Sequence, residues 1–214
     1  MKMLKGNLKK YQIFFGVIFV AIAVFAIVQA ALPAEESTAV SNLFTAITLF
    51  GQEVSEVNVF SKTLSIEEFA SFLRKLVGHF GMFAAFAASG FFTFFSGKNF
   101  KKALIIDLLA AFLLALTTET IEYFSPGRAF MVSDIVLDMQ GAITAIAVIS
   151  AILSIVFAKK GKDRQGVFPL VVIASLVFAI LFLLFNDDSF YTYFCYIVFI
   201  VCCLLSSIAL LFSK

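Results

Sequence analysis

The amino-acid sequence predicts an all-α protein, a polytopic bundle of six transmembrane helices with one amphipathic helix at the outer interface. Composition is the first reason, because 62% of the 214 residues are hydrophobic and only 14% are charged, whereas about a quarter of a soluble domain is charged. The second is a series of apolar runs of about 20 residues, the length that crosses a bilayer core. The net charge of +2 argues against a nucleic-acid partner, so the predicted partner is the lipid bilayer.

The apolar runs define six spans and four segments. The spans cover residues 11–32, 76–97, 103–124, 139–158, 167–185 and 190–212. The segments are the N-terminal tail with the first helix (1–32), an outer loop (33–64), a core of an interfacial helix and three transmembrane helices (65–158), and two additional transmembrane helices (159–214). A signal peptide cleaved after Ala30 is the alternative for the first run, but its apolar core exceeds the usual length of about 7–15 residues, which favours a retained anchor.

The distribution of positive charge predicts the orientation of the bundle. Six crossings place both termini on one side, and the pieces on that side (1–10, 96–102, 159–166 and Lys214) hold most of the Lys and Arg residues. The remaining pieces hold only Lys62, Arg74, Lys75 and Arg128. Because cytoplasmic loops carry the excess of Lys and Arg, we expect cytoplasmic N- and C-termini.

The outer loop ends in a helix-start signal, "SIEE". Ser65 followed by Glu68 forms a capping box, and Ile66, Phe69 and Leu73 recur after it at helical spacing. This pattern predicts an amphipathic helix at the outer interface that continues into the second span, with Gly78 and Gly81 allowing a bend.

Charged residues gather between the third and fourth spans, in "ETIEYFSPGRAFMVSDIVLDM" (residues 119–139). Glu119 and Glu122 lie three apart, on one face of the last turns of a helix, where the helix dipole opposes acids. The sequence "SPGR" predicts a type II turn, with positive φ at Gly127. Ser133 is the expected N-cap of the next helix, and Asp134 lies in its first turn.

Eight ionisable side chains are thereby expected at the outer ends of three helices. They are Arg74, Lys75, His79, Glu119, Glu122, Arg128, Asp134 and Asp138. Ionisable residues inside a membrane are candidates for function by default, and these eight are the predicted ligand-binding residues. The structural alternative is a charge-paired cap that joins the three helix ends.

Asp107 and the three cysteines are expected to have local structural roles. Asp107 lies near the cytoplasmic end of the third span, where an ion pair with Lys101 or Lys102 is expected. The three cysteines, Cys195, Cys202 and Cys203, lie in one apolar run, so neither a disulfide framework nor a zinc site is predicted. They are expected to be apolar packing residues.

Three charged elements in this order resemble the VanZ-like family of small bacterial membrane proteins. They read "RKLVGHF" (residues 74–80), "ETIEYFSPGR" (119–128) and "DIVLDMQG" (134–141). Three positions depart from the family pattern: Glu122 stands where the family usually has Gln, Asp138 where it usually has Asn, and Met131 where a Ser is common. The two acid substitutions make the site more negative and favour a cation, metal or proton partner more than in the average member.

The resemblance implies a bacterial plasma-membrane protein that acts at the outer leaflet, in a family linked to low-level teicoplanin resistance. The favoured hypothesis is a non-enzymatic binding or envelope-modulating protein, in which Arg74, Lys75 and Arg128 contact an anionic lipid headgroup or a glycopeptide. No cofactor and no metal are assigned.

The alternative is a membrane-embedded enzyme acting on a lipid-linked phosphate. His79 would be its nucleophile or general acid/base and Arg128 would stabilise negative charge. The carboxylates with His79 could hold a metal for that chemistry. Ion or proton transport is ranked last, because few polar residues lie deep in the other spans.

Overall fold

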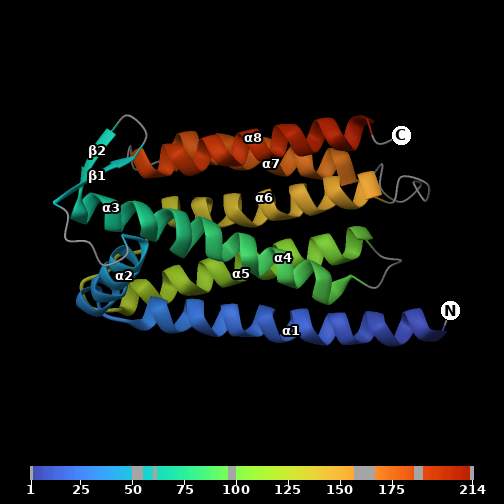
Figure 1. Cartoon of the computed structure of the whole chain (residues 1–214), viewed down its shortest axis with the longest axis horizontal. Helices are drawn as coiled ribbons and strands as arrows, with labels where there is room; N and C mark the ends of the chain where they lie inside the picture. The colour runs from blue at the N-terminus through green and yellow to red at the C-terminus, as the bar shows by residue number, and fades with distance from the viewer. Residues whose placement is uncertain are drawn as a thin grey trace.

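A computed structural model describes residues 2–49, 55–59, 62–95, 100–156, 167–185 and 190–212. The basic loop 159–166, Lys98 and Lys214, on which the orientation partly depends, lie outside the described residues. The long helices are α1 (Lys2–Ala31), α4 (Met82–Phe94), α5 (Phe100–Phe124), α6 (Val132–Val156), α7 (Val167–Phe185) and α8 (Phe190–Phe212). They lie lengthwise beside one another, and both chain ends emerge at the same end of the bundle (Figure 1).

An all-α membrane bundle is confirmed. Among the described residues, five helical segments are long and apolar enough to cross a membrane, one of them running continuously from Ile66 to Phe94. The fifth predicted span (167–185) corresponds to α7, in which the apolar stretch Val171–Phe185 is shorter.

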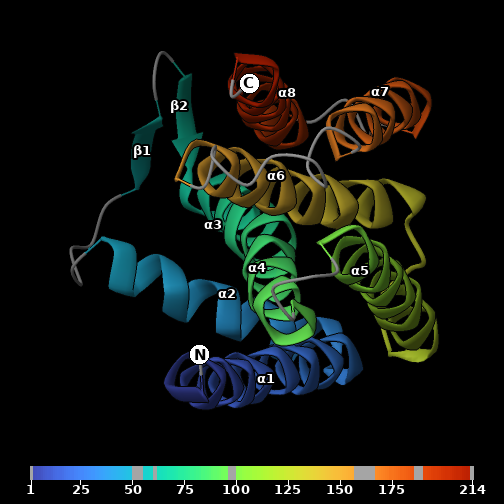
Figure 2. The same ribbon diagram turned by 90° about the vertical axis from the view of Figure 1, so that its right-hand side faces the viewer.

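Helix α6 is the centre of the bundle. It contacts α4, α5, α7 and α8, and it lies between these helices when the bundle is viewed from one end (Figure 2). In its most apolar stretch of 18 residues, 72% of the residues are buried, whereas the share in the corresponding stretch of α1 is 11%. Large apolar side chains such as Ile13 and Val17 on α1 are exposed, as expected for a helix that contacts lipid.

The predicted outer loop (33–64) contains a helix and two strands. It contains α2 (Ala34–Thr48) and a hairpin of β1 (Glu56–Val59) and β2 (Lys62–Ser65). The strands are antiparallel, with Glu56 opposite Ser65. These elements and α3 (Ile66–Leu73) lie at the end of the bundle opposite the termini (Figure 1). We call this end the hairpin end.

The predicted capping box is confirmed at the start of α3. The Ser65 hydroxyl accepts the Glu68 N–H at 3.3 Å, and the Glu68 carboxylate accepts the Ser65 N–H at 2.9 Å. The helix then continues into α4 through a π-helical segment, η1 (Arg74–Gly81), where the sequence predicted a glycine bend. π-Helical turns are rare and frequent at functional sites, and η1 carries Arg74, Lys75 and His79.

The expectation for Asp107 is wrong. Its side chain is fully buried, and neither carboxylate oxygen has a hydrogen-bond partner, while Lys101 and Lys102 are exposed. Asp107 lies on the inward stripe of α5 with Ala103, Leu104 and Ala111. Its carboxylate therefore turns toward Gly90 of α4 and away from the lysines. Cys195, Cys202 and Cys203 are free thiols in α8.

Candidate functional site

The eight predicted site residues lie together at the hairpin end. They come from η1, the last turns of α5, the α5–α6 turn and the start of α6. Six are buried: Lys75, His79, Glu119, Glu122, Asp134 and Asp138. Arg128 is partly buried and Arg74 is exposed. Buried ionisable groups need partners, so the pairing of each determines what it can do.

Lys75 and Asp134 form a buried ion pair between η1 and α6. Asp134 lies in the first turn of α6, where a negative charge also interacts favourably with the helix dipole. The helix begins one residue earlier than predicted, at Val132, and the Met131 carbonyl accepts the Asp134 N–H at 3.1 Å. Ser133 is therefore inside the first turn, and its prediction as the N-cap is wrong.

His79 faces two carboxylates of α6. Its Nδ1 lies 3.0 Å from Asp138 Oδ1, and its Nε2 lies 3.6 Å from Asp134 Oδ2. When Asp138 is ionised it only accepts hydrogen bonds, and the Nδ1–H then donates to it. This bond orients the ring and leaves Nε2 on the side of Asp134.

Arg128 and Glu122 form the second ion pair. The Arg128 guanidinium also donates to the Gln29 carbonyl of α1 at 2.9 Å. Gly127 has φ 75°, which confirms the predicted positive φ. The Pro126 carbonyl accepts the Ala34 N–H at 3.0 Å. The turn is therefore docked on the junction of α1 and α2, and Arg128 offsets the acid at the end of α5.

Glu119 is only partly compensated. Its Oε2 accepts the Met131 N–H at 2.9 Å, but its Oε1 is buried with no hydrogen-bond partner. The Oδ2 of Asp138 is likewise buried and has no hydrogen-bond partner among the described residues. The site therefore contains four buried carboxyl groups but only two cations paired with them and one histidine.

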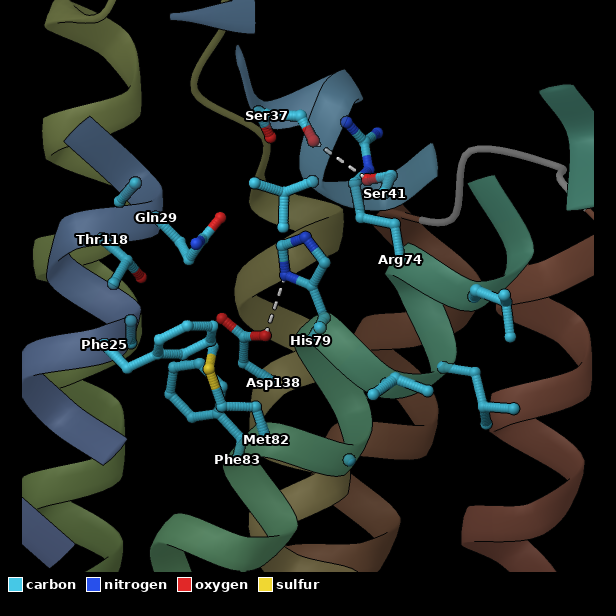
Figure 3. Close-up of a pocket in the computed structure, with 18 of the residues that line it drawn as sticks. Phe25, Gln29, Ser37, Ser41, Arg74, His79, Met82, Phe83, Thr118 and Asp138 are labelled. Carbon is cyan, nitrogen blue, oxygen red and sulfur yellow. Dashed lines mark hydrogen bonds and ion pairs between the residues drawn. The ribbon is translucent and has the colours of Figure 1, made fainter. Parts of the chain in front are cut away.

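A cavity of about 490 Å³ lies beside this cluster, between α1, α2 and the segment from α3 to α4. Of the eight residues, Arg74, His79, Glu122, Arg128 and Asp138 line it. Phe25, Met82 and Phe83 gather on one side of the His79–Asp138 pair, and Ser37, Ser41 and Arg74 lie on the other (Figure 3). The cavity thus has an apolar part and a polar part.

The sequence analysis missed the polar lining residues outside the charged elements. They are Gln29 of α1, Ser37, Ser41 and Thr48 of α2, and Thr118 of α5. Gln29 interrupts an apolar run, and Ser37 and Ser41 are spaced to share a helix face. The spacing of Ser37 and Ser41 was not recognised because the sequence predicted a loop where α2 forms.

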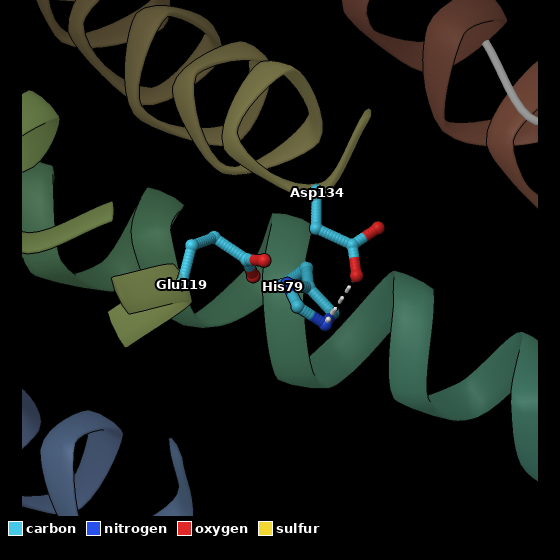
Figure 4. Close-up of side chains that lie close together, drawn as sticks. All are labelled: His79, Glu119 and Asp134. Carbon is cyan, nitrogen blue, oxygen red and sulfur yellow. Dashed lines mark ion pairs between the residues drawn. The ribbon is translucent and has the colours of Figure 1, made fainter. Parts of the chain in front are cut away.

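Among the described residues, His79, Glu119 and Asp134 form a group of side chains that could hold a metal ion. Each comes from a different helical segment, and one ligand atom from each lies within 4.8 Å of the others. Figure 4 shows the three side chains converging between η1, α5 and α6.

Comparison with known proteins adds one match. The family model described as VanZ/LLP1 matches residues 13–157, from α1 to the end of α6, and so includes all eight site residues. No curated protein and no solved structure matches the chain.

Proposed function

The chain belongs to the VanZ-like family of multi-pass membrane proteins, and on that premise we propose that it binds the polar head of an amphiphile at the outer face of a bacterial plasma membrane. In this proposal the hairpin end faces outward and both termini are cytoplasmic. The excess of Lys and Arg in the sequence segments 1–10, 96–102 and 159–166 supports this orientation.

The observation that carries the proposal is the divided lining of the cavity. Its volume of about 490 Å³ is within the range of about 300–1,000 Å³ typical of small-molecule sites. The apolar side chains of Phe25, Met82 and Phe83 suit an acyl chain, and the polar residues at the other side suit a head group. An amphiphile matches both parts at once, whereas a fully polar ligand would leave the aromatic wall in contact with its polar groups.

Arg74 is the proposed anchor for an anionic head group. It lines the cavity, is exposed, and within the described ranges has no ion pair. Lys75 and Arg128, by contrast, are each paired with a carboxylate. A guanidinium binds phosphate or carboxylate through two parallel hydrogen bonds. In this proposal Arg74, and not Lys75, makes the first contact with the ligand. Arg128 stabilises the cavity wall through its ion pair with Glu122.

The candidate ligands share an anionic or zwitterionic head and an acyl chain. A phospholipid and a lipoglycopeptide such as teicoplanin both have this chemistry. Capture of the second at the outer leaflet would lower the amount that reaches its target, which accords with the resistance linked to the family.

Drug susceptibility tests this function in cells. A Gram-positive host expresses wild type, Arg74→Gln, Arg128→Ala or the control Lys101→Gln, at matched levels in the membrane. Lys101 is an exposed basic residue in the first turn of α5, and the last turns of that helix carry Glu119 and Glu122 at the hairpin end. We expect wild type and the control to raise the inhibitory concentration of teicoplanin, and Arg74→Gln and Arg128→Ala to remove the increase. Vancomycin, which lacks an acyl chain, should show little change. Equal thresholds for host and wild type would reject the resistance role.

The His79–Asp138 hydrogen bond favours the second candidate, an enzyme acting on a lipid-linked phosphate. A carboxylate that orients a histidine at a cavity wall is an arrangement suited to general acid/base chemistry. His79→Gln separates the two candidates. An enzyme would stop releasing phosphate from a lipid-linked phosphate, whereas a binding protein would retain the ligand better in this variant than in Arg74→Gln.

A further inference from the structure

Three helical segments bring one imidazole and two carboxylates to a common point beside the cavity. His79 comes from η1, Glu119 from α5 and Asp134 from α6, and their ligand atoms lie within 4.8 Å of one another (Figure 4). Metal–ligand distances of about 2.0–2.2 Å place the ligand atoms of a tetrahedral site about 3.3–3.6 Å apart. Nε2 of His79 and Oδ2 of Asp134 already lie 3.6 Å apart, so side-chain rotations that bring the Glu119 carboxylate closer by up to about 1 Å would complete the group.

Each of the three side chains is held at one atom and has a second atom available. His79 Nδ1 lies within hydrogen-bond distance of Asp138, which leaves Nε2 as the ligand atom. Lys75 binds Oδ1 of Asp134, and the other oxygen, Oδ2, lies 3.6 Å from that Nε2. Met131 donates its N–H to Oε2 of Glu119 and leaves Oε1 free.

This arrangement is the one that outer-shell groups provide in metal proteins. A ligating histidine donates its other ring N–H to a carboxylate or carbonyl, which fixes the ring and its tautomer. Asp138 has that position here. Its Oδ1 is 3.0 Å from Nδ1, and it belongs to the same helix as the ligand Asp134.

The unpartnered oxygen of Glu119 points independently to a cation. Glu119 is 1% exposed, and its Oε1 has no hydrogen-bond partner. A buried carboxylate in that state is unfavourable unless a cation or further hydrogen bonds compensate it. Lys75 and Arg128 are directed to Asp134 and Glu122. The Lys75 ammonium would repel a metal ion bound between these side chains. The site nevertheless has four carboxyl groups and only two cations paired with them.

We propose that His79, Glu119 and Asp134 bind a divalent first-row metal ion, with Mn²⁺ and Zn²⁺ as the ions to test. One imidazole and two carboxylate ligands suit these ions, and three protein ligands leave positions open for water or a ligand oxygen. The site does not depend on amphiphile binding, because Glu119 and Asp134 do not line the cavity.

The experiment uses the full chain in detergent, treated with chelator and then desalted. Mn²⁺ or Zn²⁺ is titrated in, and bound metal is measured by mass spectrometry after gel filtration. Thermal unfolding is followed in parallel by circular dichroism, since the chain has no Trp. We expect one ion per chain and a rise in Tm with the ion, whereas Ca²⁺ at the same concentration has a smaller effect.

Variants assign the ion to these residues. Glu119→Gln should weaken metal binding by at least about tenfold, yet in chelator it should keep or raise Tm because it removes an uncompensated charge. His79→Gln should also abolish stoichiometric binding. Asp138→Asn, which changes only the group that orients His79, should weaken binding by about 10–100-fold. Asp107→Asn is the matched control, a buried carboxylate elsewhere on α5, and should bind like wild type.

Two results would overturn the proposal. The first is a wild-type chain that binds neither Mn²⁺ nor Zn²⁺ stoichiometrically and shows no rise in Tm. The second is stoichiometric binding that persists in folded Glu119→Gln. Neither result touches the proposed binding of an amphiphile, because no amphiphilic ligand is added in these titrations.

Discussion

Gly141 of α6 lies directly against the backbone of Phe80 in η1. A Cβ built on Gly141 would lie 2.9 Å from the carbonyl carbon of Phe80 and 3.0 Å from its Cα, and closer still to its carbonyl oxygen. A side chain at this position would meet backbone, which cannot move aside cheaply. This close approach of two helices places His79 beside Asp138, one turn from Gly141.

The first prediction concerns this contact. Gly141→Ala should destabilise the protein by about 1–3 kcal/mol, the usual range for overpacking, because η1 must move away from α6. Thermal unfolding in detergent measures the effect. Gly78→Ala is the control, because a Cβ there would meet only the Arg74 side chain, at 3.7 Å. Equal stability of Gly141→Ala and wild type would mean that the two helices are not in close contact.

The second prediction concerns the pair formed by Lys75 and Asp134, both buried. Lys75→Met leaves a carboxylate buried without its cation and should cost about 3–5 kcal/mol. The double variant Lys75→Met with Asp134→Asn should recover part of that loss, since it also removes the charge. Denaturant titration of the single and double variants measures both effects. A Lys75→Met protein as stable as wild type would show that the pair is not formed.

Asp107 provides a third prediction. Its carboxylate is fully buried with no hydrogen-bond partner, so an amide of the same shape should be tolerated better. We expect Asp107→Asn to match or exceed wild type in Tm, because an unsatisfied buried polar group costs about 1–3 kcal/mol and a charged one more. A clear fall in Tm would indicate that the carboxylate has a cation or proton partner.

The fourth prediction concerns orientation. Thr63 of β2, at the hairpin end, and Lys101, in the first turn of α5, are both exposed. The last turns of α5 lie at the hairpin end, so its first turn lies at the opposite end of the bundle. Single cysteines at these positions, in a background in which Cys195, Cys202 and Cys203 are replaced by serine or alanine, are treated with a membrane-impermeant maleimide. Labelling of Thr63→Cys in intact cells, and of Lys101→Cys only after permeabilisation, is expected from the positive-inside rule. The reverse pattern would place the charged site in the cytoplasm.

Features encoded along a single helix could be predicted from the sequence. The apolar runs predicted the bundle, and the spacing of Ser65 and Glu68 predicted the start of α3. The gathering of charge between residues 119 and 139 predicted which helix ends meet. Each of these signals depends on local composition or on spacing within one or two turns.

Features that depend on contact between helices could not be predicted in this way. The sequence placed three Lys and Arg residues and one histidine near four acids. Only the structure shows that Lys75 pairs with Asp134 and Arg128 with Glu122. The π-helical form of η1 has no sequence pattern beyond two glycines. Asp107 turns inward because of the rotation of α5 in the bundle. The hairpin strands are four residues each, too short for alternation to distinguish them from loop.

The central claim, that the cavity at the hairpin end binds an amphiphile, is tested most directly by filling it. Ala85 of α4 is exposed and lines the cavity, and Ala21 of α1 is exposed and does not. Binding of teicoplanin and of phosphatidylglycerol is measured on the purified protein in nanodiscs of zwitterionic lipid, for wild type, Ala85→Phe and Ala21→Phe. We predict saturable binding of at least one of the two by wild type and Ala21→Phe, and much weaker binding by Ala85→Phe. Equal binding by all three proteins, or no saturable binding by wild type, would contradict the claim.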